Sequence, residues 1–264
     1  MGESTARSLT RTLGSVRFTV LGSSGTYPTS TNPASSYLVR TDDTAIWCDA
    51  GSGGFQALAS VLDPIEVDAI VISHRHPDHC VDLFAAFPAF TDRPEPVRGV
   101  PLFAHRSVID HVLGVLDADD DHAIHSTFDI TRIEADSRWT VGDVAVRAFE
   151  MDHSVPTLGF AFESAGRRLF YTADTGVNGT WVDRVGPVDL LVSEASFQGD
   201  AVDNEYRQHM TAAQAGRIAS RIEATRLVLT HIPPHLDPLI SVREAETTHG
   251  RTVRAAVPGA TYEV

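Results

Sequence analysis

The chain is poor in cysteine and has no long apolar segment. Its 264 residues include two cysteines, Cys48 and Cys80, which are too few for the disulfide framework of a secreted domain. A membrane span needs a run of about 18 apolar residues, and the chain contains none. Residues 1–15 are polar and lack the apolar core of a signal peptide. We therefore expect a cytoplasmic protein with reduced cysteines and no membrane partner.

Positive charge is also scarce. Lysine and arginine together number 21, against 35 aspartate and glutamate residues, which gives a net charge of −14. An acidic protein repels phosphate polymers at long range, and no basic tract occurs that could offset this repulsion locally. The composition therefore argues against extended nucleic-acid binding.

The pattern of apolar residues predicts an α/β chain with strands of mixed direction. We expect residues 1–15 to form a polar N-terminal tail and residues 16–264 to form a single domain. Strands are expected at residues 16–22, 36–40, 44–48, 67–73, 101–105, 139–150, 159–163, 168–172, 189–193 and 226–230. Helices are expected at residues 108–116 and 211–222, the second capped by Thr211, and a last helix precedes two short strands. Hairpins mixed with crossovers imply sheets covered by helices.

One stretch between the predicted elements, Asp117 to Thr127, is dense in aspartate and histidine. Its composition allows two interpretations, a mobile flap or a solvated loop. The sequence leaves both open.

Histidine is the residue in surplus, with twelve copies, and the densest group follows directly after the strand that ends at Ser73. This group reads His74-Arg-His76-Pro-Asp78-His79. Histidine is the commonest metal ligand in proteins, and the local chain has no room to give each imidazole a separate structural partner. In a turn, His74 and His76 can face one way and Asp78 with His79 another. The group therefore predicts ligands for two divalent ions.

The spacing His-x-His-x-Asp-His after a buried strand resembles the signature of the metallo-β-lactamase superfamily. The other ligands of that signature recur in order at later strand ends, as His153, Asp174 and His231. Upstream, Asp49 matches the superfamily's structural aspartate. The resemblance implies an α/β fold of four layers, αββα, in which two mixed sheets form a sandwich.

The resemblance also implies a complete ligand set. One ion would be held by His74, His76 and His153, the other by Asp78, His79 and His231, with Asp174 bridging both. The ions would be zinc, or manganese or iron, because the same nitrogen and oxygen ligands accept each of these metals. A hydroxide between the two ions would be the nucleophile, since the metals lower the pKa of bound water. Asp78 is assigned a catalytic role in addition to its role as a ligand.

Later residues resemble the phosphodiesterase branch typified by ribonuclease Z. Glu194 ends a strand, and His209 opens a helix before the final His231. By that likeness His209 would donate a proton to the leaving alkoxide or stabilise the phosphoryl oxygens, oriented by Glu194. The alternative is that His209 only begins a helix and Glu194 is a surface charge.

The glycine-rich turn at residues 22–25 also resembles the opening of this branch. Its backbone N–H groups could donate to a phosphate. A glycine-rich turn is commonly just a turn, and that alternative stays open.

The chain departs from ribonuclease Z at one informative place. Ribonuclease Z carries a long basic arm between its third and fourth motifs, whereas only 21 positions separate His153 from Asp174 here. Together with the acidic charge, this favours similarity to a small armless group of cyclic-nucleotide phosphodiesterases related to ribonuclease Z. The likeness implies hydrolysis of a small phosphodiester, best represented by 3′,5′-cyclic AMP, by a homodimer.

Three other functions stay open on the residues alone. A ribonuclease Z-like RNA endonuclease would use the same site. A lactonase or β-lactamase-like hydrolase shares every metal ligand but does not need His209. A third alternative is an interaction module without catalytic activity that metal ions merely stabilise.

Overall fold

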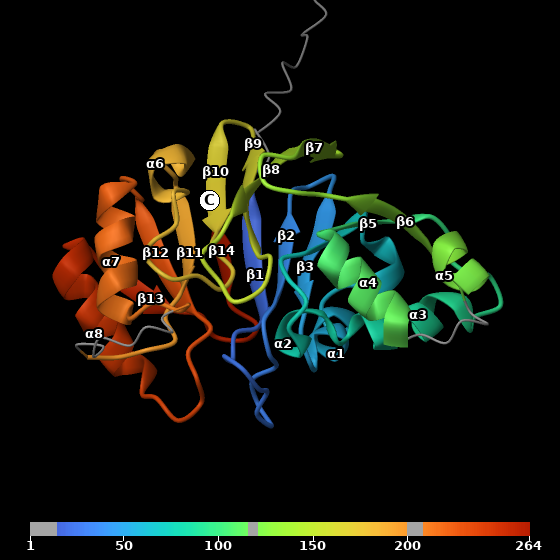
Figure 1. Cartoon of the computed structure of the whole chain (residues 1–264), viewed down its shortest axis with the longest axis horizontal. Helices are drawn as coiled ribbons and strands as arrows, with labels where there is room; N and C mark the ends of the chain where they lie inside the picture. Colours follow the sequence, from blue (N-terminus) through green and yellow to red (C-terminus); the bar gives the residue numbers. More distant parts are fainter. Residues whose placement is uncertain (1–14, 116–120, 200–207) are drawn as a thin grey trace, which may run out of the picture.

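A computed structural model describes residues 15–115, 121–199 and 208–264 and contains two seven-stranded sheets (Figure 1). The first sheet has the order β14-β1-β2-β3-β4-β5-β6. Its strands are β1 (Arg17–Gly22), β2 (Ser36–Arg40), β3 (Ala45–Ala50), β4 (Ala69–Ile72), β5 (Val100–Ala104), β6 (Phe128–Arg132) and β14 (Thr261–Glu263). The final strand thus returns to the sheet in which the described chain begins.

The second sheet has the order β13-β12-β11-β10-β9-β8-β7. Its strands are β7 (Arg138–Val141), β8 (Val144–Glu150), β9 (Leu158–Ser164), β10 (Arg167–Tyr171), β11 (Leu190–Glu194), β12 (Arg226–Thr230) and β13 (Val253–Ala255). In each sheet an antiparallel portion continues into a parallel portion, which begins between β3 and β4 and between β10 and β11. The predicted sandwich of two mixed sheets is confirmed.

Helices cover the outer faces of both sheets (Figure 1). The helices beside the first sheet are α1 (Gly54–Ala59), α2 (Pro77–Cys80), α3 (Leu83–Thr91), α4 (Arg106–Val115) and α5 (Asp121–Thr127), and a short 3-10 turn spans Pro64–Glu66. The helices beside the second sheet are α6 (Val182–Val185), α7 (Ala212–Arg221) and α8 (Pro238–His249). The helix predicted from Thr211 is confirmed as α7, because Thr211 and Gln214 form a reciprocal capping box.

Three apolar clusters hold these layers together. Alternate residues of each central strand face opposite sides, so Val71 of β4 packs between the sheets while Ile70 and Ile72 pack against the helices of the first sheet. The third cluster joins the second sheet to α6, α7 and α8. Burying apolar side chains in all three clusters fixes the strand ends relative to one another.

Two expectations about local structure are wrong. Residues 139–150 do not form one strand, because Gly142 has a φ of +54° and turns the chain between β7 and β8 into a tight hairpin. The predicted flap or solvated loop is also wrong for residues 121–127, which form α5 and bury Ile124 in the cluster beside the first sheet. Residues 117–120 of that stretch lie outside the described residues, as does the predicted tail apart from residue 15.

The sequence patterns missed α3 and β6. Pro88 lies inside α3 and conceals its helical period, although Leu83, Phe87 and Phe90 are buried there.

Within the described ranges, no helix is long and apolar enough to cross a membrane.

The packing of α7 on α8 predicts an unusual response to a glycine substitution. Ordinarily alanine stabilises a helix interior relative to glycine by up to about 1 kcal/mol. A Cβ at Gly216 of α7 would instead collide with the backbone oxygen of Ala245 and the hydroxyl of Thr248. Gly216→Ala should therefore lower the free energy of unfolding by about 1–3 kcal/mol in urea denaturation.

Gly114 in α4 is the matched control, because no described atom lies within 4 Å of the point that a Cβ would occupy there. Gly114→Ala should leave stability unchanged or raise it. Equal effects of the two substitutions would contradict the close approach of α7 to α8.

Candidate metal centre

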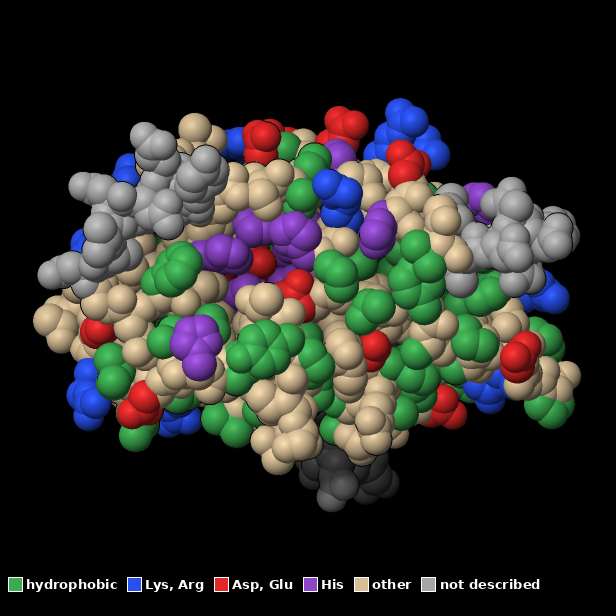
Figure 2. Space-filling view, turned by 60° about the horizontal axis from the view of Figure 1, so that its bottom comes forward, with side chains coloured by type: hydrophobic (Ala, Val, Ile, Leu, Met, Phe, Trp, Pro, Cys, Tyr) green, Lys and Arg blue, Asp and Glu red, His purple; other side chains and the backbone are tan. Residues whose placement is uncertain are grey.

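The predicted ligands lie at the carboxyl ends of strands from both sheets. His74 follows β4, His153 follows β8, Asp174 follows β10 and His231 follows β12. The carboxyl ends of neighbouring parallel strands meet at one edge of a sheet, and the sandwich brings two such edges together. Figure 2 shows histidine side chains gathered around carboxylates in one hollow of the surface, with hydrophobic side chains beside it.

The structure brings His74, His76 and His153 together as one cluster. His76 Nδ1 lies 3.1 Å from His74 Nε2 and 3.1 Å from His153 Nε2. Burial lowers the pKa of His74 well below its usual value, and the neighbouring His79 lowers it further. Burial likewise lowers the pKa of His76 and of His153. These imidazoles are therefore neutral near pH 7, and a neutral imidazole has the lone pair that a metal ion requires.

A second cluster contains Asp78, His79 and His231. Asp78 Oδ2 lies 3.2 Å from His231 Nε2 and 3.7 Å from His79 Nε2. The backbone N–H of Thr26 donates to the same carboxylate oxygen over 3.0 Å and so helps to orient it. The loop after β1 therefore contributes to the centre, a contact that the sequence patterns did not reveal.

Asp174 lies between the two clusters, with one carboxylate oxygen on each side. Its Oδ2 is 3.6 Å from His74 Nε2 and 3.8 Å from His153 Nε2. Its Oδ1 is 3.3 Å from His79 Nε2 and 3.5 Å from His231 Nε2. This geometry is the one expected of a bridging carboxylate.

The donor set of the two clusters fits metal ions. In each cluster the candidate ligand atoms lie within 4.8 Å of one another. His79 Nε2 and Asp174 Oδ1 are buried and lie 3.3 Å apart, yet neither forms a well-aligned hydrogen bond with the other or with another described residue. Leaving such atoms unsatisfied is costly, and a divalent cation with nitrogen and oxygen ligands would satisfy both. These histidine and aspartate clusters are thus able to bind metal.

Each of four candidate ligand histidines has an outer hydrogen bond that orients its ring. Nδ1 of His74 lies 3.0 Å from Ser73 Oγ, and Nδ1 of His79 lies 2.8 Å from Asp49 Oδ2. Nδ1 of His153 lies 2.9 Å from the Gln208 carbonyl oxygen, and Nδ1 of His231 lies 2.9 Å from Ser196 Oγ. We assign the proton of each neutral ring to Nδ1, which donates it to the outer partner. The lone pair of each Nε2 then faces the centre.

Asp49 lies behind the metal loop and is fully buried. Its carboxylate accepts hydrogen bonds from the Ser73 N–H (2.7 Å) and hydroxyl (2.8 Å), from His79 Nδ1 (2.8 Å) and from the Tyr171 hydroxyl (2.8 Å). It belongs to neither cluster, and it contacts the second one only through the outer Nδ1 of His79. The position agrees with the structural role that the resemblance implied for Asp49.

Glu194 and His209 form a third group beside the second cluster. Glu194 is fully buried, so the alternative that it is a surface charge is wrong. His209 Nδ1 donates to Glu194 Oε1 over 2.9 Å, and its ring centroid lies 4.9 Å from that of His153 and 5.5 Å from that of His231. Burial opposes protonation, but the charge and hydrogen bond of Glu194 raise the pKa of His209 to about 9.

Ser196 is a residue of the site to which the sequence patterns assigned no role. Its hydroxyl donates to Glu194 Oε2 over 2.8 Å and accepts from His231 Nδ1 over 2.9 Å. It therefore links the Glu194–His209 pair to the second cluster. The only local signal was its place two residues after Glu194 at the end of a strand.

The turn after β1 does not offer the phosphate donors that its glycines suggested. The N–H of Ser23 donates to the Asn32 side chain, that of Ser24 to the Pro33 carbonyl and that of Gly25 to the Ile232 carbonyl. These amides are already used within the protein. The interpretation of residues 22–25 as a phosphate-binding turn is therefore wrong.

Comparison with known families identifies the chain. Residues 44–232, more than half of the sequence, match the family model described as Beta-lactamase superfamily domain. The protein therefore belongs to the beta-lactamase superfamily, as its motifs indicated.

Similar proteins extend over nearly the whole chain. The uncharacterized protein Rv1339 of Mycobacterium tuberculosis is 31% identical over 258 residues, covering 96% of this chain and 94% of that protein. A ribonuclease Z of Natronomonas pharaonis is 28% identical over 319 residues, covering 95% and 98%. The crystal structure of YhfI from Bacillus subtilis, a metallo-beta-lactamase fold protein, superposes with a TM-score of 0.85 at 25% identity and covers 95% of this chain and 100% of that chain.

The shared position of Asp174 predicts that its loss affects both clusters. Elemental analysis of purified Asp174→Ala should therefore find less bound metal than in the wild-type protein. The loss of metal affinity should exceed the about 10–100-fold loss that is typical when a residue that only orients a ligand is replaced. Asp183→Ala is the control, because this exposed carboxylate pairs with Arg221 on the surface. Unchanged metal content in Asp174→Ala would contradict the assignment.

The four hydrogen bonds of Asp49 predict a second effect on metal binding. Asp49→Asn would present an amide N–H₂ to donors that need an acceptor, so it should weaken metal affinity by about 10–100-fold in a competition titration with a chelator. Tyr171→Phe removes only one of the four donors and should have a smaller effect. Wild-type affinity in the Asp49→Asn variant would show that the Asp49 charge does not support the metal loop.

Proposed function

We propose that this member of the beta-lactamase superfamily is a metal-dependent phosphodiesterase that hydrolyses a small phosphodiester. The first substrate to test is 3′,5′-cyclic AMP. The observation that carries the proposal is the buried Glu194 carboxylate bonded to His209 beside two clusters of metal-type ligands. A relative of 28% identity bears the name ribonuclease Z, which denotes cleavage of RNA phosphodiesters.

In this proposal each of the two clusters would hold one metal ion. His74, His76 and His153 would hold one ion, zinc in the first instance, and Asp78, His79 and His231 a second, with Asp174 shared between them. When bound, the ions supply Lewis acidity and lower the pKa of a water molecule towards neutrality. Asp78, with 13% of its side chain accessible, would orient the attacking group.

His209 would act as the general acid. Its pKa of about 9 keeps the ring protonated near neutral pH, and its side chain remains 27% exposed. Nδ1 is held by Glu194, so Nε2 is the atom left to give a proton to the departing alkoxide. Glu194 itself accepts from the backbone N–H of Thr175 over 2.7 Å and is held rigidly.

The size of the space beside the centre supports a small substrate. A hollow of about 600 Å³ adjoins His153 and is lined by His105, Glu134 and Glu150 among others. Carboxylates at its wall disfavour a polynucleotide backbone, which agrees with the net charge of −14.

The chain between His153 and Asp174 supports the same conclusion. It forms β9, β10 and the turn between them, which leaves no room for a nucleic-acid-binding arm. The alignment with ribonuclease Z spans 319 positions although this chain has 264, so that relative carries segments that are absent here.

A panel of substrates tests the proposed function directly. The metal-loaded protein should hydrolyse bis-p-nitrophenyl phosphate and cyclic AMP faster than a lactone or precursor transfer RNA. Turnover of the lactone alone would favour a lactonase, and cleavage of precursor transfer RNA alone would favour an RNA endonuclease. Failure to cleave either phosphodiester would overturn the proposal.

The assigned role of His209 predicts a selective loss. His209→Ala should lower kcat for phosphodiesters by about 10²–10⁴-fold, the usual contribution of a positioned acid, while the bound metal stays unchanged. His111→Ala on α4 is the matched control and should retain full activity. A His209→Ala variant with wild-type kcat on phosphodiesters would remove the main support for this proposal.

A further inference from the structure

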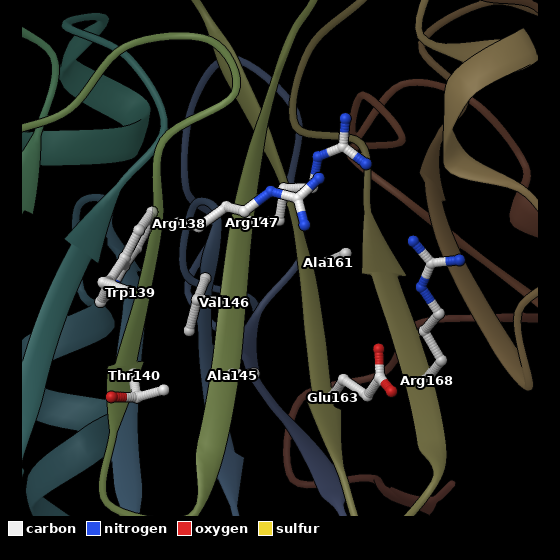
Figure 3. Close-up of a pocket in the computed structure, with 9 residues that line it drawn as sticks. All are labelled: Arg138, Trp139, Thr140, Ala145, Val146, Arg147, Ala161, Glu163 and Arg168. Carbon is white, nitrogen blue, oxygen red and sulfur yellow. The ribbon is translucent and has the colours of Figure 1, made fainter.

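A shallow trough of about 390 Å³ lies on the second sheet (Figure 3), and none of the candidate metal ligands lines it. It crosses β7, β8, β9 and β10 on the side that faces the helices, because Arg147 alternates with Val146 and Ala148, which pack between the sheets. Ala145 and Ala161 are among the small residues that line it. Arginine side chains form much of its wall, as Figure 3 shows.

The strand register places like charges directly opposite one another in this trough. Arg138 of β7 pairs with Arg147 of β8, and Arg147 pairs with Ala161 of β9. Like charges at directly opposed positions destabilise a sheet. The small Ala161 side chain beside them leaves space above the sheet in which a counter-charge could lie.

The next row along the sheet adds a third arginine. Arg168 of β10 pairs with Glu163 of β9, and Glu163 pairs with Ala145 of β8. Burial lowers the pKa of Arg168, the charge of Glu163 raises it and that of Arg147 lowers it again. Glu163 is the one carboxylate among the residues that line the trough, whereas three arginines line it, Arg138, Arg147 and Arg168.

These arginines have hydrogen-bond donors without partners. Arg147 is held by Asp136 at 2.9 Å and lies over the Phe149 ring at 4.4 Å, yet its buried Nε bonds to no described atom. The buried Nε of Arg168 is also unpartnered within the described ranges. Asp136 is already shared with Arg184, so it cannot satisfy these donors.

The geometry points to a binding site for a phosphate group in this trough, held by Arg138, Arg147 and Arg168. A phosphate presents several acceptor oxygens to the planar forks of the guanidinium groups. It would offset the repulsion between Arg138 and Arg147 by accepting hydrogen bonds from guanidinium groups that line the trough. The site is independent of the proposed hydrolysis, because none of these side chains belongs to the metal clusters.

The positive charge of the trough differs in sign from the net charge of the chain. The chain contains no lysine, so each of its 21 basic residues is an arginine, while its net charge is −14. Three arginines around a small hollow therefore contrast with the acidic whole. A broad polyanion would meet the repulsion of the remaining surface, whereas a small phosphate-bearing molecule would meet only the trough.

Arginine side-chain NMR tests the proposal on the full-length, metal-loaded protein. Inorganic phosphate is titrated against chloride at constant ionic strength, and AMP is used in a second series to learn whether the group is recognised alone or within a nucleotide. The Nε–H signals of Arg147 and Arg168 should move with one shared midpoint in at least one series. The signal of Arg167, which pairs with Asp189 at 2.8 Å outside the trough, should not move.

Substitutions separate the trough from the metal centre. Arg138→Gln should weaken phosphate binding at Arg147 and Arg168 by about tenfold or more, because it removes a charge-assisted hydrogen bond to the phosphate. Arg167→Gln is the matched control and should leave the midpoint of the phosphate titration unchanged. Asp174→Ala, which alters only the metal centre, should leave this midpoint unchanged as well.

Three results would overturn the proposal. The first is the absence of any response of Arg147 and Arg168 to phosphate and to AMP. The second is an unaltered midpoint in Arg138→Gln. The third is a response to protein concentration instead of phosphate, which would make this face a contact between two copies of the chain.

Discussion

The arrangement of the metal-binding edge depends on one buried carboxylate. Asp49 lies at the end of β3 and accepts four hydrogen bonds, from donors in both sheets. Ser73 and His79 come from the first sheet and its metal loop, while Tyr171 comes from the second. A buried charge is tolerated only when hydrogen bonds satisfy it, so the loop after β4 cannot move without exposing an unsatisfied group. This constraint orients His79 directly, and through the Ser73 hydroxyl it also orients His74.

Backbone strain accompanies this arrangement. Asp49, Ala173 and His231 have positive φ values of 57°, 51° and 54°, all at strand ends that surround the centre. A residue with a side chain in this region costs of order 1–3 kcal/mol. Ala173 directly precedes Asp174, and His231 is itself a candidate ligand, so the strained positions adjoin the two clusters. The three apolar clusters supply the stability that holds these strained positions in place.

Burial and nearby carboxylates give the histidines of this edge different protonation states. Burial keeps His74, His76 and His153 neutral, which suits metal ligands. Burial opposes the protonation of His79 and His209 as well, but neighbouring carboxylates raise the pKa of both rings. Two groups of the same residue type thus acquire opposite protonation states from their surroundings. Ser196 lies at the boundary, since its hydroxyl contacts Glu194 on one side and His231 on the other. The candidate metal ligand His231 and the proposed proton donor His209 thus share one hydrogen-bond network.

The α/β class, most strands and the ligand group His74 to His79 could be predicted from local features of the sequence, namely apolar alternation and the spacing of residues after a buried strand. The cap at Thr211 likewise predicted α7. His153, Asp174 and His231 were expected as ligands through the resemblance to the superfamily. Contacts between distant residues needed the folded chain. Asp49 meets Tyr171 across 122 positions, and Asp78 meets His231 across 153. Ser196 and the Thr26 amide acquire their roles only when the sheets face each other, and packing of Ile124 turns an apparent loop into α5. No periodicity or motif records such pairs, since they arise from how the two sheets pack.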